Sequence, residues 1–319
     1  NKNKIIVIAE AGGNHNGSIK KAFKLVDIAK KAGADYVKFQ SFTADSLVSK
    51  NAPKAKYQQK NVKNLSHYEM ISNLSMSYQM HKKLFDYCKL KKIKFLSSIF
   101  SVKSLQMLKK FKIDYLKIPS GEITNLPLLV EAAKSKKPLI LSTGMCSLKE
   151  VVTAVKILLK NGLNKYNLSI LHCNTEYPSP YEDLNLKAIK VFQKRFKFAT
   201  IGYSDHSLGV EASIAAVGMG AKIIEKHFTI SKNLPGPDHK SSLDEKELKS
   251  LIKSIRNVEK SLGIEKKIVS KSEKKNIIIA RKSIYASDYI KKGEKFSKQN
   301  IVCLRPFKGI SPMKFNKLL

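Results

Sequence analysis

The first four-fifths of the chain alternates short apolar runs with longer amphipathic segments. Near-continuous apolar runs are typical of parallel strands that helices cover on both sides. An architecture of eight β-then-α units predicts a (β/α)₈ TIM barrel over residues 1–263, and a doubly wound open sheet is the alternative. The eight predicted strands are Lys4–Glu10, Asp35–Gln40, Ile93–Ser98, Asp114–Ile118, Pro138–Thr143, Asn167–Cys173, Ala199–Tyr203 and Lys222–His227.

The segments between these runs carry the helical period. In the last of them Ser242 and Glu245 have the spacing of a capping box, and Gly263 predicts the end of the helix. Its apolar stripe consists of Leu248, Leu251, Ile252, Ile255, Val258 and Leu262. The link Ser41–Lys92 is too long for a simple connection, so we expect an excursion over the barrel mouth.

A different pattern follows the barrel. Residues 264–279 are charged and broken, which predicts a linker. Residues 280–319 hold short β-like pieces at Ser283–Ala286, Ile290–Glu294 and Asn300–Arg305, which predict a small β-rich domain. A domain of so few residues has only a small hydrophobic core. We therefore expect it to pack against the barrel or against a partner chain.

The charge of the chain is extreme but evenly spread. The net charge is +35, yet only four of the 60 basic residues are arginine. Nucleic-acid readers concentrate arginine and interleave aromatic side chains, so this lysine coat disfavours nucleic acid as a partner. No apolar stretch approaches the ~20 residues of a membrane span and no signal peptide opens the sequence, which predicts a cytoplasmic protein with no membrane partner.

Polar side chains end the predicted strands. In TIM barrels such residues form the active site. Lys38 and Lys117 stand out because each is flanked by apolar residues, and with neighbouring hydroxyls they would bind phosphate and carboxylate. The strand-end groups are Glu10, Lys38, Gln40, Ser97, Ser98, Lys117, Ser120, Glu122, Ser142, Thr143, His172, Thr175, Tyr177, Ser204, Asp205, His206 and His227. Together they predict an enzyme that acts on an anionic substrate.

Two histidines end adjacent predicted strands. His206 and His227 would meet over the mouth, where two imidazoles with waters and substrate oxygens suit Mn²⁺ or a similar divalent ion. Two hydrogen-bonded histidines beside a cleft are the alternative. The rigid loop Pro235–His239 would bring Asp238 close to them, where its carboxylate accepts sugar hydroxyls.

The chain resembles the sialic acid (N-acetylneuraminate) synthase family, which includes the legionaminate synthases, over nearly its whole length. The matching segments are Ala9–Gly17, Val37–Phe42, Lys117–Glu122, Leu141–Met145, His172–Pro178, Gly202–His206, Glu225–Phe228, Gly236–His239, Ala280–Ser283, Lys291–Glu294 and Arg305–Met313. One departure lies at Ser98-Ile99, where the family has Thr-Pro, although Ser98 keeps a hydroxyl. A second is Phe307-Lys308, where small or polar residues are usual.

The resemblance implies a TIM barrel followed by an antifreeze-like (SAF) domain at 280–319, which would be incomplete at its C-terminus. This domain would be swapped over the partner's site in a homodimer. Mn²⁺ would be held by His206 and His227, and Arg305 would reach the sugar's acyl group across the dimer. Phosphoenolpyruvate would be held by Lys38, Lys117, Ser120, Ser142 and Ser204. Glu10, Gln40, Glu122, Tyr177 and Asp238 would surround the sugar and the reacting carbons.

The reaction that the resemblance implies joins phosphoenolpyruvate to an N-acylated amino sugar and releases phosphate. Glu10 or Glu122 would activate the water that adds to C2. N-acetylmannosamine is the first expectation for the sugar, a 6-deoxy diacetamido sugar that gives legionaminate is the alternative, and pseudaminate synthesis is a more distant third. A basic polyanion-binding protein that keeps only the scaffold is the alternative from another class.

Overall fold

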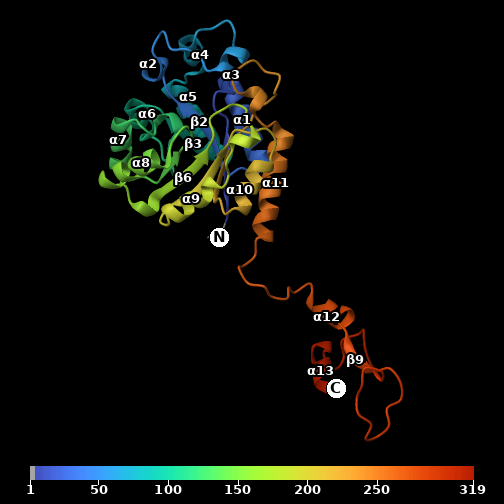
Figure 1. Ribbon diagram of the computed structural model, residues 1–319. Coiled ribbons are helices and arrows are strands. Elements are labelled where there is room, and N and C mark those ends of the chain that lie inside the picture. Colours follow the sequence, from blue (N-terminus) through green and yellow to red (C-terminus); the bar gives the residue numbers. More distant parts are fainter. Residues whose placement is uncertain (1–3) are drawn as a thin grey trace. The chain divides into compact units, whose positions relative to one another are not determined.

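A closed barrel of eight parallel strands forms the centre of the larger part of the chain (Figure 1). This computed structural model describes residues 4–319. The strand order runs from β1 to β8, and β8 pairs with β1 from Ile6–Ile223 to Glu10–His227. The strands are β1 (Ile6–Glu10), β2 (Tyr36–Ser41), β3 (Lys94–Ile99), β4 (Leu116–Ile118), β5 (Leu139–Ser142), β6 (Leu168–Cys173), β7 (Thr200–Asp205) and β8 (Ile223–His227). The predicted TIM barrel is therefore confirmed, and the open-sheet alternative is wrong.

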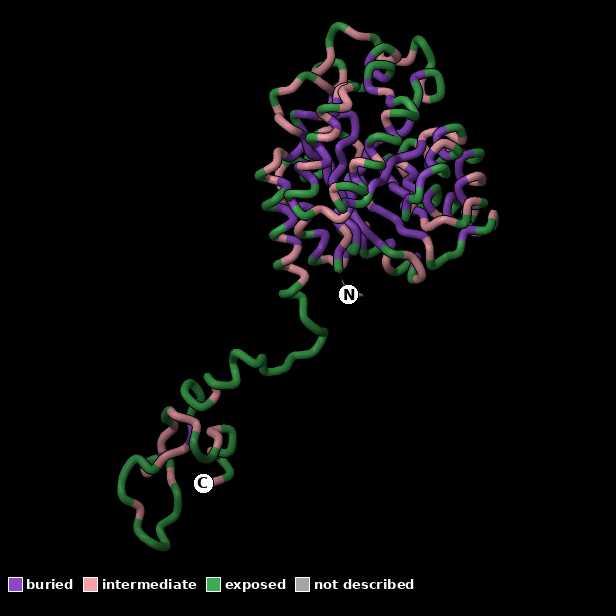
Figure 2. Tube along the Cα trace, turned by 180° about the vertical axis from the view of Figure 1, so that it is seen from behind, coloured by how far each residue is buried: buried purple, intermediate pink, exposed green. Residues whose placement is uncertain are grey.

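Amphipathic helices surround the barrel and bury their apolar stripes against the outer face of the strands (Figure 2). Ser18 caps the first helix, and Gly33 ends it in the left-handed conformation that glycine adopts without strain. The helices that follow the eight strands are α1 (Ile19–Ala32), α5 (Tyr78–Leu90), α6 (Val102–Leu108), α7 (Leu126–Lys134), α8 (Leu148–Lys160), α9 (Ala188–Arg195), α10 (Glu211–Gly218) and α11 (Glu245–Ser261).

The expected excursion between β2 and β3 is present. It contains α2 (Ala44–Leu47), α3 (Lys56–Asn61) and α4 (His67–Leu74), which precede α5. Figure 1 shows these three helices gathered at one end of the barrel. They pack around a small apolar cluster of their own, which includes Met70 and Leu74.

The predicted cap of α11 is wrong by two residues. The helix begins after Asp244, whose carboxylate accepts from the Glu247 backbone N–H at 2.9 Å, and Glu247 completes the capping box. The Ser242 hydroxyl has other partners, because it donates to the Asp238 carbonyl at 2.7 Å and accepts from the Asn14 amide at 2.9 Å. Ser242 therefore fastens the loop after β8 instead of capping the helix.

Residues 264–319 form a second compact unit. Its antiparallel pair, β9 (Ser283–Ala286) and β10 (Ile301–Leu304), matches two of the three predicted β pieces. The third is wrong: at Ile290–Glu294 the chain turns, with Gly293 at φ 88° and the Glu294 N–H bonded to the Lys291 carbonyl. The expected linker is also partly wrong, since α12 (Lys274–Ala280) forms inside it. A short helix, α13 (Phe315–Leu318), closes the unit. In the described part of the chain, no helix combines the length and the apolarity needed to cross a bilayer.

Candidate active site

The candidate site lies directly above an apolar layer of side chains inside the barrel, toward the carboxyl ends of the strands. Gly202 belongs to this layer, because a Cβ there would lie 2.5 Å from Leu171 Cδ2 and from the Ile223 carbonyl oxygen. The layer contains Ile8, Tyr36, Leu96, Ile140, Leu171 and Ile223, with Tyr115 packed against them. Side chains two residues further along a strand point to the same face. On the eight strands those residues, here called the polar layer, are Glu10, Lys38, Ser98, Lys117, Ser142, Cys173, Ser204 and Glu225, and all line one cavity of about 390 Å³.

Four buried charges compensate one another in the polar layer. Lys38 Nζ lies 3.0 Å from Glu10 Oε2 and 3.4 Å from Glu225 Oε1. Lys117 Nζ lies 3.7 Å from the same Glu225 oxygen. Serine hydroxyls complete the shell: Lys38 Nζ donates to Ser98 at 2.8 Å, and Lys117 Nζ donates to Ser142 at 2.7 Å. The layer is thus preorganised around two ammonium groups that can turn to an incoming anion.

Burial perturbs the acidity of these groups. Desolvation raises the pKa of Glu10 to about 7, although Lys38 opposes this shift. Desolvation lowers the pKa of Lys117, whereas for Glu225 the two lysines outweigh burial and hold the pKa below its ordinary value. For Lys38, burial lowers the pKa, but Glu10 and Glu225 outweigh it and raise the pKa. Glu10 is therefore poised to exchange a proton near neutral pH.

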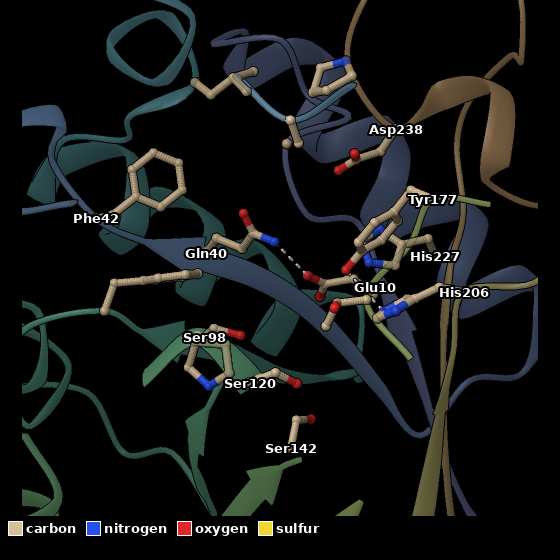
Figure 3. A pocket seen from close by; sticks show the side chains of 18 of the residues that line it. Glu10, Gln40, Phe42, Ser98, Ser120, Ser142, Tyr177, His206, His227 and Asp238 are labelled. Atoms are coloured by element: carbon tan, nitrogen blue, oxygen red, sulfur yellow. Dashed lines mark hydrogen bonds between the residues drawn. The ribbon is translucent and has the colours of Figure 1, made fainter. Parts of the chain in front are cut away.

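Above the polar layer a ring of aromatic and acidic groups continues the cavity. Figure 3 shows Tyr177, His206 and His227 together on one side, with Asp238 beside them and Gln40 next to Glu10. The Gln40 amide donates to Glu10 Oε1 at 3.1 Å, and the Tyr177 hydroxyl lies 3.1 Å from His206 Nε2. Burial raises the pKa of Asp238 to about 6.

The two histidines fit an open divalent-metal site. Their ring centroids lie 5.2 Å apart, and both rings are buried at the cavity. His206 Nδ1 bonds to the Asn174 carbonyl, which leaves Nε2 on the side of Tyr177. His227 Nδ1 is buried without a hydrogen-bond partner among residues 4–319. Nowhere in those residues do three or more His, Cys, Asp or Glu side chains gather as a metal cage, so water and substrate oxygens would have to supply the other ligands.

The far side of the cavity is mostly apolar. We call its apolar residues the apolar wall: Phe42, Leu47, Val48, Met70, Ile71, Leu74 and Phe100. Five of the wall residues come from the excursion after Phe42, and Phe100 follows β3. Gln58 and His67 of the same excursion also line the cavity. Figure 3 shows Phe42 across the cavity from Tyr177 and His206. One cavity therefore has the charged polar layer at its bottom and, on its far side, an apolar wall that favours methyl groups over hydroxyls.

The structure brings most of the predicted site residues together, but six of them do not line the cavity. Four are the strand-end groups Ser97, Thr143, His172 and Asp205, each of which is next to an inward-facing residue on its strand and so points the other way. The other two are Glu122 and Arg305. Glu122 is not among the lining residues; its carboxylate accepts from the Asn125 amide at 2.7 Å just beyond Ser120 and Gly121. Arg305 is exposed in the second unit. The residues that line the cavity are Glu10, Lys38, Gln40, Ser98, Lys117, Ser120, Ser142, Thr175, Tyr177, Ser204, His206, His227 and Asp238.

Sequence reasoning missed Glu225, Cys173 and the apolar wall. Glu225 was available from the pattern, because it lies two residues before His227 and so faces the same way. The same argument applies to Cys173, which is two residues beyond the inward-facing Leu171. The wall had no comparable signal, since its residues come from short helices whose folding over the mouth the sequence does not specify.

Comparisons with known proteins find relatives over most of the chain. A sequence model of the NeuB family matches residues 25–267. An N,N'-diacetyllegionaminic acid synthase of Campylobacter jejuni is 48% identical over 99% of this chain and 95% of its own length. A second, from Legionella pneumophila, is 45% identical over 98% of this chain and 88% of its own. The crystal structure of an N-acetylneuraminic acid synthetase from Leptospira borgpetersenii, solved with citrate, matches with a TM-score of 0.76 and 34% identity, covering 86% of this chain and 90% of that one.

Proposed function

The chain belongs to the NeuB family, and from that premise we propose that it condenses phosphoenolpyruvate with an N-acylated amino sugar to give a nonulosonic acid and phosphate. The observation that carries the proposal is the polar layer, with two buried ammonium groups and their serines facing one cavity. The cytoplasm, where phosphoenolpyruvate is formed, is the compartment we propose for the reaction.

Phosphoenolpyruvate binds, in this proposal, to the polar layer. The ammonium groups of Lys38 and Lys117 bind its phosphate and carboxylate, and hydroxyls of Ser98, Ser120, Ser142 and Ser204 complete the shell. Both lysine side chains are almost fully buried, at 3% and 2% exposure, so water screens their attraction for an anion only weakly. The negative charge of Glu225 holds both ammonium groups in place before the substrate arrives.

The chemistry forms a C–C bond and a C–O bond from water to C2, and it breaks the C–O bond between C2 and phosphate. C3 of phosphoenolpyruvate bonds to the aldehyde carbon of the open-chain sugar, and water adds to C2. Glu10 accepts the proton of that water, and a proton returns to the aldehyde oxygen, which becomes a hydroxyl. The tetrahedral carbon then expels phosphate while its new hydroxyl loses a proton and becomes the C2 ketone, and the two lysines stabilise the charge of the departing phosphate. We assign the base to Glu10 because it lines the cavity and has a pKa of about 7, whereas Glu122 lies outside the lining.

We propose that His206 and His227 hold a divalent ion such as Mn²⁺. Bound there, such an ion would supply Lewis-acid polarisation of the aldehyde oxygen. Tyr177 orients His206 through the hydrogen bond to Nε2 in the free protein, and its hydroxyl can turn to the sugar when the ion binds. Asp238 and Gln40 accept and donate to sugar hydroxyls. Thr175 adds a further hydroxyl at the rim.

Between the two acceptors that the sequence left open, we now favour the 6-deoxy diacetamido sugar, which reverses the order expected from the sequence. Two relatives that carry the name diacetyllegionaminic acid synthase support it. The apolar wall supports it independently, because this sugar has a methyl group at C6 and a second acetamido methyl where N-acetylmannosamine has hydroxyls. Burying an unpaired hydroxyl against such a wall is unfavourable.

For the second unit we propose an antifreeze-like (SAF) domain that acts in a homodimer, with Arg305 recognising the sugar's acyl group. Within residues 264–319 only Ser283 and Ile301 are buried, so the unit has little core of its own, and Tyr289 and Met313 are exposed. Light scattering of the full chain tests the dimer: a monomer at micromolar concentration contradicts it. Mixing an Arg305→Ala chain with an inactive barrel variant would then restore activity only if the domain acts in trans.

Phosphate release tests the proposed function. Full-length protein is incubated with phosphoenolpyruvate and Mn²⁺, with either sugar or with none. We expect release that depends on both the sugar and the metal and that stops on addition of EDTA. Release without a sugar would indicate a phosphatase, and no release with either sugar would contradict the proposed reaction.

A further inference from the structure

A buried ion pair lies on the outer side of the barrel, behind the two histidines. Lys226 Nζ is 2.9 Å from Asp205 Oδ2, and the two side chains are 1% and 0% exposed. Asp205 and Lys226 are register partners on β7 and β8. Their neighbours Ser204 and Glu225 face the cavity, so by the alternation of a strand the ion pair faces the helices. Tyr203, Ile224 and Phe228 share this apolar outer layer.

Hydrogen bonds of the ion pair hold the backbone on both sides of His206. Asp205 Oδ1 accepts from the Ser207 backbone N–H at 2.9 Å and from its hydroxyl at 2.7 Å. Asp205 Oδ2 accepts from the Ser213 hydroxyl of α10 at 2.6 Å. Lys226, the residue before His227, donates from Nζ to the Ser207 carbonyl at 2.6 Å. The backbones that carry the two histidines are thus joined through one fully buried network.

Stability alone does not require charges at this place. Two apolar side chains of similar size would fill the layer equally well, and such replacements of buried ion pairs are often neutral or stabilising. Among the charged side chains buried in residues 4–319, the others line the cavity, namely Glu10, Lys38, Lys117 and Glu225. This pair differs from an apolar pair because its hydrogen bonds are directional. They fix residues 205–207 against β8, and apolar contacts would not.

We infer that Asp205 and Lys226 are positioning residues that set the separation and orientation of the His206 and His227 rings for a divalent ion. The inference rests on the proposed function, because it takes the two histidines as the metal ligands. The ring centroids, 5.2 Å apart, are held by the register of β7 and β8 together with this network. Groups that hydrogen-bond a metal ligand directly typically change metal affinity 10- to 100-fold when removed, and a network that holds the backbones of both ligands should act in the same direction.

The test is metal affinity in a variant that keeps the fold. Asp205→Leu combined with Lys226→Met removes both charges together and leaves none unpaired. Mn²⁺ alone is titrated into the full chain by calorimetry, and phosphoenolpyruvate is titrated separately with EDTA present. We expect Mn²⁺ binding to weaken at least tenfold, with phosphoenolpyruvate affinity within twofold of wild type, because the lysines of the polar layer lie on the other face.

Asp35→Asn is the matched control. Asp35 accepts from Arg256 Nη2 and from the Val7 N–H, at 2.8 and 2.9 Å, at the amino end of the barrel. This variant should unfold at lower urea but bind Mn²⁺ as wild type does. If the double variant fails to fold, Ser213→Ala replaces it, and a smaller selective loss of Mn²⁺ affinity is expected.

Three results overturn the inference. The first is Mn²⁺ affinity within twofold of wild type in the folded double variant, or in Ser213→Ala where that variant replaces it. The second is a parallel loss of Mn²⁺ and phosphoenolpyruvate binding, which indicates a general disturbance. The third is wild-type protein that binds no Mn²⁺, which removes the ligand assignment itself. The proposed reaction is judged separately, by phosphate release.

Discussion

The polar layer and the apolar wall face each other across one cavity but come from different parts of the chain. The polar layer takes one residue from each of the eight strands, so closure of the barrel fixes its side chains relative to one another. Most of the wall comes from short helices in the excursion between β2 and β3. Rigid strands suit groups that must meet reacting atoms, whereas insertions can change without disturbing the barrel. We therefore expect the polar layer to carry the common reaction and the apolar wall to select the sugar.

The largest effect should come from removing a charge of the polar layer. We expect Lys117→Met to lower kcat/KM about 10³-fold, because Glu225 loses one of its two cationic partners and the departing phosphate loses its stabilisation. Steady-state phosphate release measures it. Lys94→Met is the control, since Lys94 is 63% exposed at the opposite end of β3 and should keep full activity. Equal activity in the two variants would contradict the role of the polar layer in stabilising the departing phosphate.

A pair of glutamine variants sharpens the assignment of the base. Glu10→Gln should lower kcat by about 10²-fold, within the usual contribution of a positioned general base. Glu122→Gln should lose much less, because Glu122 lies outside the lining and bonds to Asn125. Single-turnover kinetics at saturating phosphoenolpyruvate separate this step from binding. The reverse order of the two losses would move the role to Glu122.

Burial in the polar layer also predicts a pH dependence of stability. The pKa of Glu10 is raised from 4.5 to about 7, so the folded protein keeps a proton that the unfolded chain has already lost. Stability conferred by that proton is fully present below pH 4.5 and is lost as the pH rises through about 7. Relative to Glu10→Gln, the wild type should lose about 3 kcal/mol of unfolding free energy across this window. Urea unfolding at a series of pH values measures the difference, and parallel curves for the two proteins would refute the shift.

The smallest effect should come from the apolar wall. We expect Met70→Gln to change the ratio of kcat/KM for the two sugars by roughly tenfold in favour of N-acetylmannosamine, since one group in an apolar pocket discriminates modestly. Phosphoenolpyruvate affinity should not change. Met80→Gln, on α5 outside the cavity lining, is the matched control. An equal decrease in kcat/KM for both sugars would contradict a role of the apolar wall in specificity.

The barrel could be predicted because near-continuous apolar runs between amphipathic segments are local signals, and the chain repeats them eight times. Lys38 and Lys117 could be placed in the cavity for the same reason: a lysine between apolar neighbours on a buried strand must face a polar interior. Glu225 is less conspicuous in the sequence because it lies before the strand end, two residues ahead of His227. The spacing of Ser242 and Glu245 imitates a capping box, and the tertiary partner of Ser242, Asn14, is remote in the chain. The wall and the Asp205–Lys226 pair likewise depend on contacts between distant segments.

A competition between the two sugars tests the account most directly. Equal concentrations of N-acetylmannosamine and the 6-deoxy diacetamido sugar are mixed with phosphoenolpyruvate, Mn²⁺ and the full-length protein, and the products are quantified by mass spectrometry. The account predicts that the legionaminate product exceeds the neuraminate product by at least about tenfold. A dominant neuraminate product would contradict the role of the wall, and the absence of both products would contradict the reaction assigned to the polar layer.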